Sequence, residues 1–152
     1  MRVTRAMCRG KPAGCVLDFG RRPLQAGLGG CPWRVAVASI LLCRTRKVCV
    51  APMLKGFFAR WPTAGDLARS DTEELEAVLQ PLGLQRRRAR QLQRFSVRYL
   101  GDSWEELTDL PGVGAYVRDA VGLVCFGLTD VACGDKALLE YVECCQSSTT
   151  VT

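Results

Sequence analysis

From Pro32 onward, the sequence repeats one pattern: a residue that starts a helix, apolar residues at a spacing of about 3.6, and then a helix breaker. Residues 33–42 are apolar almost all round, which predicts a buried helix at the centre of the core. Another helix is expected over Gln85–Leu100, and one more follows residue 114, with its apolar stripe at Val117, Ala120, Val121, Val124 and Cys125. The pattern predicts an all-α protein.

Several helix ends can be placed from single residues. Pro52 suits the first position of a helix that Pro62 ends, because proline has a preset φ and lacks the N–H that a first turn leaves unused. Two capping-box-like pairs follow, Thr63 with Asp66 and Asp71 with Glu74. Residues 81–83, Pro-Leu-Gly, then predict a turn before the next helix.

Charge is unevenly distributed along the 152 residues. Residues 1–60 contain twelve Lys or Arg and a single acid, Asp18, whereas residues 61–152 contain nine Lys or Arg and fourteen acids. A front half this basic indicates a polyanionic partner. Nucleic acid is favoured over a membrane surface, because no basic helix with an aromatic face accompanies the charge. The basic leader, residues 1–24, is expected to be irregular, and the alternative that it is merely disordered stays open.

The predicted helix Gln85–Leu100 has a strongly cationic face. Ala89, Leu92, Ser96 and Tyr99 form its inner stripe, and no acid accompanies its six arginines, Arg86, Arg87, Arg88, Arg90, Arg94 and Arg98. A solvated face is the usual explanation of such a run, and contact with phosphates is the other.

Other classes of protein are excluded by what the chain lacks. The apolar run of residues 35–42 is too short to span a bilayer, so a soluble, intracellular protein without membrane contact is expected. The nine cysteines form no Cys-x-x-Cys and lie in helical patterns, which indicates reduced thiols that mostly fill the core. Without histidine or clustered thiols, no metal site is expected.

Residues 110–114, Leu-Pro-Gly-Val-Gly, separate two predicted helices. Glycines there permit positive φ and close backbone approach, so the bend exposes its N–H groups beside the free N–H groups of the next helix. Such an array binds a phosphate, sometimes together with a monovalent cation, which makes Gly112, Val113 and Gly114 candidate DNA-phosphate ligands. A plain connector is the alternative.

These features together resemble a known family. The bend, a helix, and then residues 130–135 ending in Asp135 are similar to the helix-hairpin-helix DNA glycosylase superfamily (HhH-GPD). More narrowly, seven segments resemble the branch of thymine/uracil mismatch glycosylases that carries a methyl-CpG-binding domain: residues 32–34, 42–45, 61–64, 79–84, 88–90, 95–100 and 135–136. The resemblance runs over 117 residues, 25–141. It implies a glycosylase-like domain at 25–143, whose closing helix is truncated or replaced, and an irregular tail at 144–152.

The resemblance also implies roles for individual residues. Asp135 matches the catalytic carboxylate that stabilises the cationic sugar. Arg44 matches the residue that fills the space left by a flipped nucleotide, and Leu84 the wedge against the orphaned base. Tyr116 and Gln25 match the residues that bind the extruded pyrimidine.

The reaction follows from the same comparison. Relatives that also cleave the backbone have a lysine where Tyr116 stands, so simple hydrolysis without lyase chemistry is expected. No four-cysteine cluster follows Asp135, so no iron-sulfur cluster or other cofactor is expected, apart from a monovalent cation at the bend. The expected substrate is thymine or uracil opposite guanine in double-stranded DNA, at deaminated CpG, excised by a nuclear monomer in base excision repair.

The sequence departs from the family pattern at several positions. Cys43 replaces an asparagine, Lys136 a histidine, and the glycine-rich residues 26–30 interrupt an expected helix. Two alternatives therefore stay open: a helix-hairpin-helix module that binds DNA without catalysis, and a truncated inactive isoform.

Overall fold

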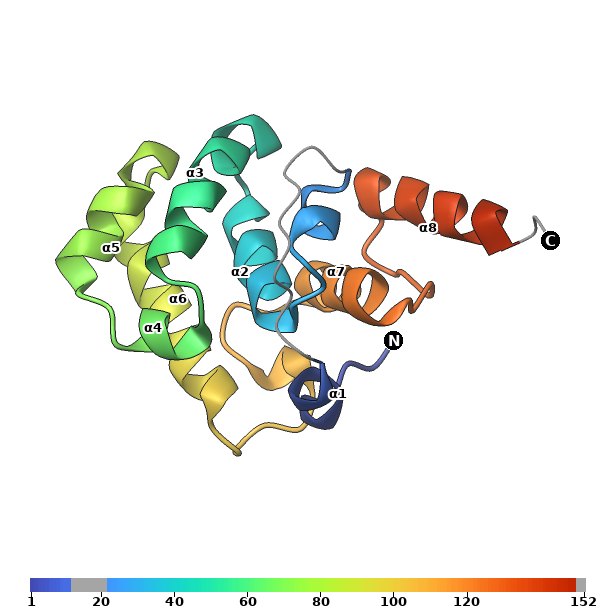
Figure 1. The fold of residues 1–152 in the computed structure, drawn as a ribbon, viewed down its shortest axis with the longest axis horizontal. Helices are drawn as coiled ribbons and strands as arrows, with labels where there is room; N and C mark the ends of the chain where they lie inside the picture. The colour runs from blue at the N-terminus through green and yellow to red at the C-terminus, as the bar shows by residue number, and fades with distance from the viewer. Residues whose placement is uncertain (12–21, 150–152) are drawn as a thin grey trace.

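A computed structural model describes residues 1–11 and 22–149, and its regular elements in those ranges are all helices (Figure 1). This confirms the predicted all-α class. The longer helices are α1 (Arg5–Gly10), α2 (Pro32–Leu42), α3 (Lys47–Arg60), α4 (Ala64–Ala68), α5 (Thr72–Leu79), α6 (Gln85–Leu100), α7 (Ala115–Phe126) and α8 (Lys136–Thr149). Three short 3-10 turns, η1 (Leu24–Gly27), η2 (Gln80–Leu82) and η3 (Leu107–Asp109), connect them.

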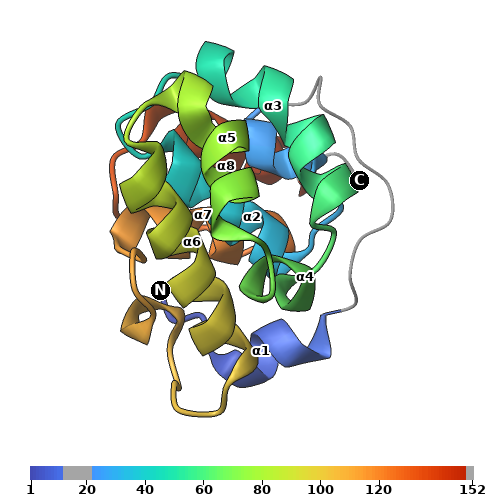
Figure 2. The ribbon, with the colours of Figure 1, turned by 90° about the vertical axis from the view of Figure 1, so that its left-hand side faces the viewer.

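Helix α2 is the centre of the molecule, as its all-round apolar sequence predicts. Nine of its eleven residues are buried. It packs against α7 on one side and against α3 and α6 on the other (Figures 1 and 2). The core therefore has two halves joined by one helix.

Helices α4 and α5 cover the inner face of α6. The expected capping box is complete at the start of α4, whereas α5 has only the Asp71 half of its expected pair, because Glu74 pairs with Arg60. Thr63 and Asp66 form the full capping box of α4, and Asp71 accepts the N–H groups of Glu73 and Glu74 at the start of α5. The predicted stripe of α6 is buried: Ala89, Leu92, Ser96 and Tyr99, joined by Phe95.

The predicted start of α3 at Pro52 is wrong. The helix begins at Lys47, and Pro52 lies in its interior. Proline there removes one intrahelical hydrogen bond, to the carbonyl of Val48. The side chain of Val48 is exposed, so water is available as a substitute partner. Buried Val50, Leu54 and Phe57 hold the helix against the core despite that loss.

The N-terminal segment is ordered for residues 1–11, which corrects the expectation of an irregular leader. Thr4 caps α1, and Val3 and Cys8 are buried. The backbone of this segment exchanges hydrogen bonds with residues 105–107, including Leu107 N–H to the Val3 carbonyl at 2.8 Å. A side chain at Gly122 of α7 would collide with Met1, so the segment lies directly against that helix. Residues 12–21 lie outside the described part of the chain.

The C-terminal tail is also more regular than expected. Helix α8 continues to Thr149, so the prediction of an irregular tail is wrong for residues 144–149. Within residues 136–148 of α8, the buried side chains are Leu138 and Val142. The helix therefore closes over the core with its first two turns and projects outward beyond them (Figure 1).

The cysteines only partly fulfil the expected role as core fillers. No disulfide joins the eight cysteines in the described part of the chain; Cys8, Cys31 and Cys125 are buried, whereas Cys43, Cys49 and Cys144 are exposed. Among residues 1–11 and 22–149, no helix has the length and apolar content that crossing a bilayer requires.

Candidate functional site

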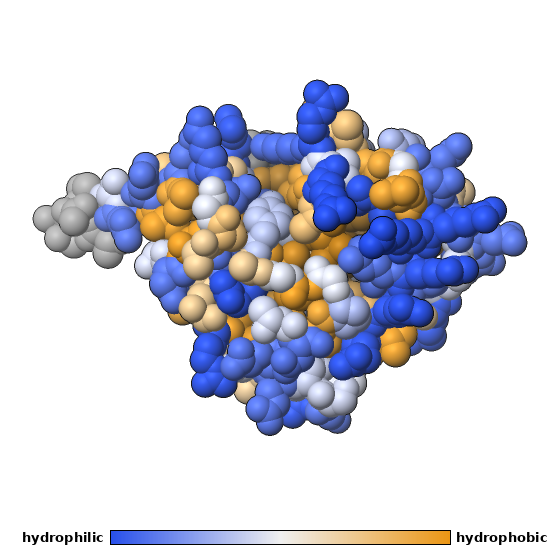
Figure 3. All heavy atoms as spheres, turned by 180° about the vertical axis from the view of Figure 1, so that it is seen from behind, coloured by the Kyte–Doolittle hydropathy of each residue, from blue (hydrophilic) through white to orange (hydrophobic). Residues whose placement is uncertain are grey.

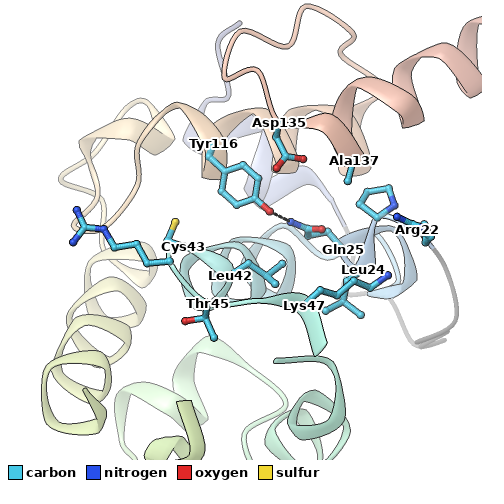
Figure 4. Close-up of a pocket in the computed structure, with 12 residues that line it drawn as sticks. Arg22, Leu24, Gln25, Leu42, Cys43, Thr45, Lys47, Tyr116, Asp135 and Ala137 are labelled. Atoms are coloured by element: carbon cyan, nitrogen blue, oxygen red, sulfur yellow. Dashed lines mark hydrogen bonds between the residues drawn. The ribbon is translucent and has the colours of Figure 1, made fainter. Parts of the chain in front are cut away.

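A pocket of about 560 Å³ opens between η1, the turn from α2 to α3, and the first residues of α7 and α8 (Figure 4). It brings together four residues that the sequence analysis singled out: Gln25, Arg44, Tyr116 and Asp135. The rest of its lining is Arg22, Pro23, Leu24, Leu42, Cys43, Thr45, Lys47 and Ala137. One half-buried carboxylate thus shares a cavity with a buried amide, a phenol and three cations.

Asp135 caps α8 and lines the pocket at once. Its Oδ1 accepts the Leu138 N–H at 3.0 Å, while Oδ2 has no hydrogen-bond partner among the described residues. Gly134, at φ +73°, turns the chain just before it, a conformation that favours glycine. Capping and catalysis are therefore compatible, because capping leaves one carboxylate oxygen free.

Gln25 and Tyr116 form a fixed polar pair at the floor of the pocket. The Gln25 amide nitrogen donates to the Tyr116 hydroxyl at 2.8 Å (Figure 4). It also donates to Ser39 Oγ at 3.2 Å. Burial raises the pKa of Tyr116 to about 12, and the negative charge of Asp135 adds to this while the Gln25 bond opposes it. The phenol is therefore protonated at neutral pH and has a hydrogen to donate.

Ser39 also belongs to this polar group, although it was not among the predicted site residues. Its hydroxyl donates to the Val35 carbonyl at 2.7 Å, so towards Gln25 it acts as an acceptor. The signal was present, since Ser39 is the one polar residue in the apolar run 35–42. A buried hydroxyl in such a run indicates a specific partner, but its identity depends on a residue of another element.

Arg44 and Leu84 share an unusual backbone conformation. They have φ +62° and +50°, and they are the only non-glycine residues at positive φ in the described part of the chain. Such conformations cost about 1–3 kcal/mol each and persist where surrounding contacts impose them. Leu84 is also 67% exposed, which is a poor place for a large apolar side chain unless it has a partner.

Arg88 explains how these two turns are held. Its guanidinium donates to the Gly83 carbonyl at 3.1 Å, next to Leu84. It also donates to the Leu41 carbonyl at 3.3 Å and to Thr45 Oγ1, on either side of Arg44. The prediction that Arg88 belongs to the exposed cationic face is therefore wrong, because Arg88 braces two turns instead.

The glycine bend differs in two respects from its prediction. The element before it is the single 3-10 turn η3 rather than a full α-helix. The Val113 N–H donates to the Leu110 carbonyl at 3.3 Å, so it is used within the bend. Gly112, at φ +81°, and Gly114 remain as exposed-amide candidates, together with the first turn of α7, which has no side-chain cap.

A second cleft, of about 540 Å³, lies between the bend and α6. Gln91 packs so closely on Gly112 that a Cβ there would lie 2.7 Å from the glutamine nitrogen. Hydrophilic side chains gather over α6 on this face (right in Figure 3). The cleft is lined by Pro111, Gly112, Gln91 and four arginines, Arg86, Arg87, Arg90 and Arg94. We call these four the arginine row.

The arginine row is not charge-compensated by the part of the chain that the structure describes. None of its members forms an ion pair with a described residue. Four uncompensated cations beside backbone amides are an attractive site for a chain of phosphates.

Metal binding has little support among the described residues. No group of three or more His, Cys, Asp or Glu side chains there is arranged to hold a metal ion. A monovalent cation at residues 110–114 would have backbone carbonyls as ligands, since the side chains of these residues contain no oxygen.

The family is established by comparison with known proteins. A family model described as HhH-GPD superfamily base excision DNA repair protein matches residues 37–146. The chain belongs to the HhH-GPD superfamily. The match contains Arg44, Leu84, the bend, Tyr116 and Asp135, whereas Gln25 precedes it.

Individual HhH-GPD relatives agree with this. The chain is 36% identical over 110 residues to a methyl-CpG-binding domain protein 4-like protein of Arabidopsis thaliana, a match that covers 72% of this chain and 25% of the relative. It is 35% identical over 133 residues to a thymine/uracil-DNA glycosylase of Pyrobaculum aerophilum, covering 83% of this chain and 57% of the relative. The chain thus spans between a quarter and three fifths of these relatives.

Solved structures show the same arrangement. A thermostable thymine-DNA glycosylase superimposes with a TM-score of 0.60 at 28% identity, over 64% of this chain and 48% of that one. A non-covalent endonuclease III–DNA complex follows with a TM-score of 0.52 at 27% identity, over 64% of this chain and 49% of that one.

Proposed function

We propose that this HhH-GPD chain is a monofunctional DNA glycosylase that hydrolyses the N-glycosidic bond of thymine or uracil mispaired with guanine. The observation that carries the proposal is the single pocket in which the free oxygen of Asp135 adjoins the Gln25–Tyr116 pair. Relatives named thymine/uracil-DNA glycosylase support the choice of base. Repair of deaminated CpG by a nuclear monomer acting on double-stranded DNA completes the proposal.

Asp135 supplies the chemistry. Loss of the base leaves positive charge on the deoxyribose, and a fixed carboxylate beside C1′ stabilises that charge more in the transition state than in the substrate. The same oxygen can orient the attacking water. Tyr116 stands where lyase relatives have a lysine, and a phenol cannot form a Schiff base with the sugar, so the reaction ends at hydrolysis.

Gln25 gives the pocket its preference for thymine and uracil. Both hydrogens of its amide are engaged, by Ser39 and by Tyr116, which leaves Oε1 as an acceptor for a ligand. Thymine and uracil carry a donor at N3, whereas cytosine carries an acceptor there. Cytosine would leave two acceptors facing each other, and turning the amide over would break the bond to Ser39.

Arg44 and Leu84 hold the extruded state. Removing a nucleotide from the stack costs a few kcal/mol, which inserted side chains can offset. Arg44 lines the pocket, and Leu84 is exposed on a second positive-φ turn that Arg88 links to the turn of Arg44. We assign Arg44 to the vacated space and Leu84 to the orphaned partner base.

The test is incubation of the purified chain with a panel of labelled duplexes, followed by alkali. Strand breakage is expected at G·T and G·U pairs, but not at A·T or G·C pairs, and without alkali the strands should stay intact. A folded protein that leaves both mismatches intact would contradict the proposal. Binding to the mismatches without breakage would favour the non-catalytic module instead.

The arginine row predicts a steep dependence of DNA binding on salt. Each phosphate contact contributes about −0.9 to the slope of log K against log salt, so Arg86→Ala with Arg90→Ala should lower the slope by about two. Affinity should fall equally for matched and mismatched duplexes, because phosphates carry no sequence information. Fluorescence anisotropy between low and moderate salt measures this.

A matched control removes the same charge elsewhere. Arg60 and Arg69 are exposed and pair with Glu74 and Asp66, away from the cleft. Their double replacement by alanine should leave the slope nearly unchanged. Equal slopes for the two double variants would show that the row acts only through net charge.

A further inference from the structure

Asp119 is the one fully buried charged side chain in the described part of the chain. A buried carboxylate is costly unless hydrogen bonds compensate for the lost hydration. An apolar residue at this position of α7 would fill the core without that cost. Its presence therefore indicates a task that a charged acceptor performs better.

The partners of Asp119 lie in the loop between α7 and α8. Its Oδ2 accepts the backbone N–H groups of Ala132 at 2.8 Å and Cys133 at 3.0 Å, and its Oδ1 accepts Arg118 Nε at 2.9 Å. Burial alone would raise the pKa of Asp119, but these hydrogen bonds outweigh it and keep the pKa below the usual value. The side chain is thus an anion at neutral pH, tied to two consecutive amides.

The loop that Asp119 holds carries Asp135. Cys133 is two residues before it in the same loop. Between them, Gly134 turns the chain at positive φ. Anchoring residues 132 and 133 therefore fixes the start of this turn and, through it, the position of the Asp135 carboxylate.

Helix α7 also connects Asp119 to the base-binding pocket. Asp119 lies three residues after Tyr116 on α7, so the two side chains leave the same helix about one turn apart. Tyr116 bonds to Gln25 and Asp119 bonds to the loop. Helix α7 thereby fixes the position of the Asp135 carboxylate relative to the Gln25–Tyr116 pair.

We infer that Asp119 is a positioning residue, which fixes the Asp135 carboxylate against the sugar of the extruded nucleotide by anchoring the Ala132 and Cys133 amides. The inference rests on the proposed glycosylase function. It differs from a role in stability alone, because that role would affect the amount of folded protein and leave the placement of charge in the pocket unchanged.

Three variants separate these contributions. Asp119→Ala removes all three hydrogen bonds; Asp119→Asn keeps an uncharged acceptor for the loop; Arg118→Ala removes the ion pair and leaves the loop bonds. Misplacing a catalytic group by about 1 Å can cost about 10²-fold, and we expect that loss in the single-turnover excision rate of Asp119→Ala. Asp119→Asn should fall between it and the parent. Arg118→Ala should lose at most about fivefold, the scale of a partly exposed ion pair.

A binding measurement reads the position of the charge directly. One duplex carries a neutral tetrahydrofuran abasic analogue, and the other carries a protonated pyrrolidine analogue with its charge near C1′. The parent should prefer the cationic duplex, and Asp135→Asn should lose most of that preference. Asp119→Ala should lose at least about tenfold of it, since charge–charge energy falls with separation, whereas Arg118→Ala should retain it.

The measurements use temperatures at which circular dichroism shows each variant folded, and Asp119→Asn is the fallback if the alanine variant does not fold. Normal excision by both Asp119 variants would overturn the inference, as would slower excision with an unchanged analogue preference. A parent that excises no base would overturn the proposed function instead, and the analogue preference of the variants would still decide the inference.

Discussion

Replacing Asp135 by asparagine is expected to lower the single-turnover excision rate from a G·T duplex by about 10³-fold. A full negative charge about 4 Å from the developing cation is worth about 4 kcal/mol at an effective dielectric constant of about 20, which corresponds to that factor. Asparagine is nearly isosteric, so the pocket keeps its shape. Quantifying alkali-labile strand breaks with enzyme in excess over the duplex measures the rate.

The fold should survive this substitution. Oδ1 of Asp135 accepts the Leu138 N–H, and an asparagine oxygen can do the same, since both residues are good N-caps. Duplex affinity should stay equal or rise, because an anion near phosphates has been removed. Asp71→Asn is the matched control, since it makes the same chemical change at the N-cap of α5 and should leave excision unaltered. Excision by Asp135→Asn within tenfold of the parent would exclude Asp135 as the catalytic group.

Replacing Arg88 by methionine is expected to slow excision by about 10²-fold. The turns that carry Arg44 and Leu84 would lose the hydrogen bonds that hold them both, and a group misplaced by about 1 Å can lower the rate by about that factor. The Gly83 and Leu41 carbonyls would lose a charged donor, and a hydrogen bond to a charged group contributes about 1.5–3 kcal/mol. Thermal stability should therefore fall as well. Arg88→Lys should recover little, since an ammonium group cannot span three acceptors as a guanidinium does.

Base extrusion distinguishes a defect of insertion from a general loss of stability. A 2-aminopurine beside the mismatch fluoresces more when its neighbour leaves the stack, so the parent should raise the signal and Arg88→Met should raise it much less. Arg69→Met is the control, because Arg69 is exposed, pairs with Asp66 and lines neither the pocket nor the arginine-row cleft. An extrusion signal equal to that of the parent, measured where Arg88→Met is folded, would mean that the brace serves stability alone.

The helices could be predicted because their signals are local. The hydrophobic period located α2, α6 and α7, and side-chain caps located the starts of α4 and α5. The start of α3 was missed because proline is favoured at a first turn yet tolerated inside a helix whose apolar face is well buried. Segment 1–11 was misjudged because its charge count dominates its composition, whereas the burial of Val3 and Cys8 depends on contacts with residues far along the chain.

The candidate site divides in the same way. Asp135, Tyr116, Arg44 and Leu84 were proposed for the site through the resemblance to the family, which rests on short segments that are each readable within a few residues. Ser39, Arg88 and Asp119 were missed, because each role depends on at least one hydrogen bond to a residue 13 to 47 positions away. The residues next to Arg88 and Asp119 in the sequence do not reveal which carbonyl groups Arg88 will donate to, or which amides Asp119 will accept from.

The sequence by itself determined the all-helical class, the glycine bend and the family, because periodicity, caps and turn chemistry act over a few residues and need no partner. The tertiary structure alone decided which polar groups share a pocket and which arginine turns inward. Gln25 and Asp135 are more than a hundred residues apart and line one pocket only because α2 and α7 pack together. The free energy of that packing comes from apolar surface, which is nondirectional, so only the finished core fixes the distances between the polar groups at its edge.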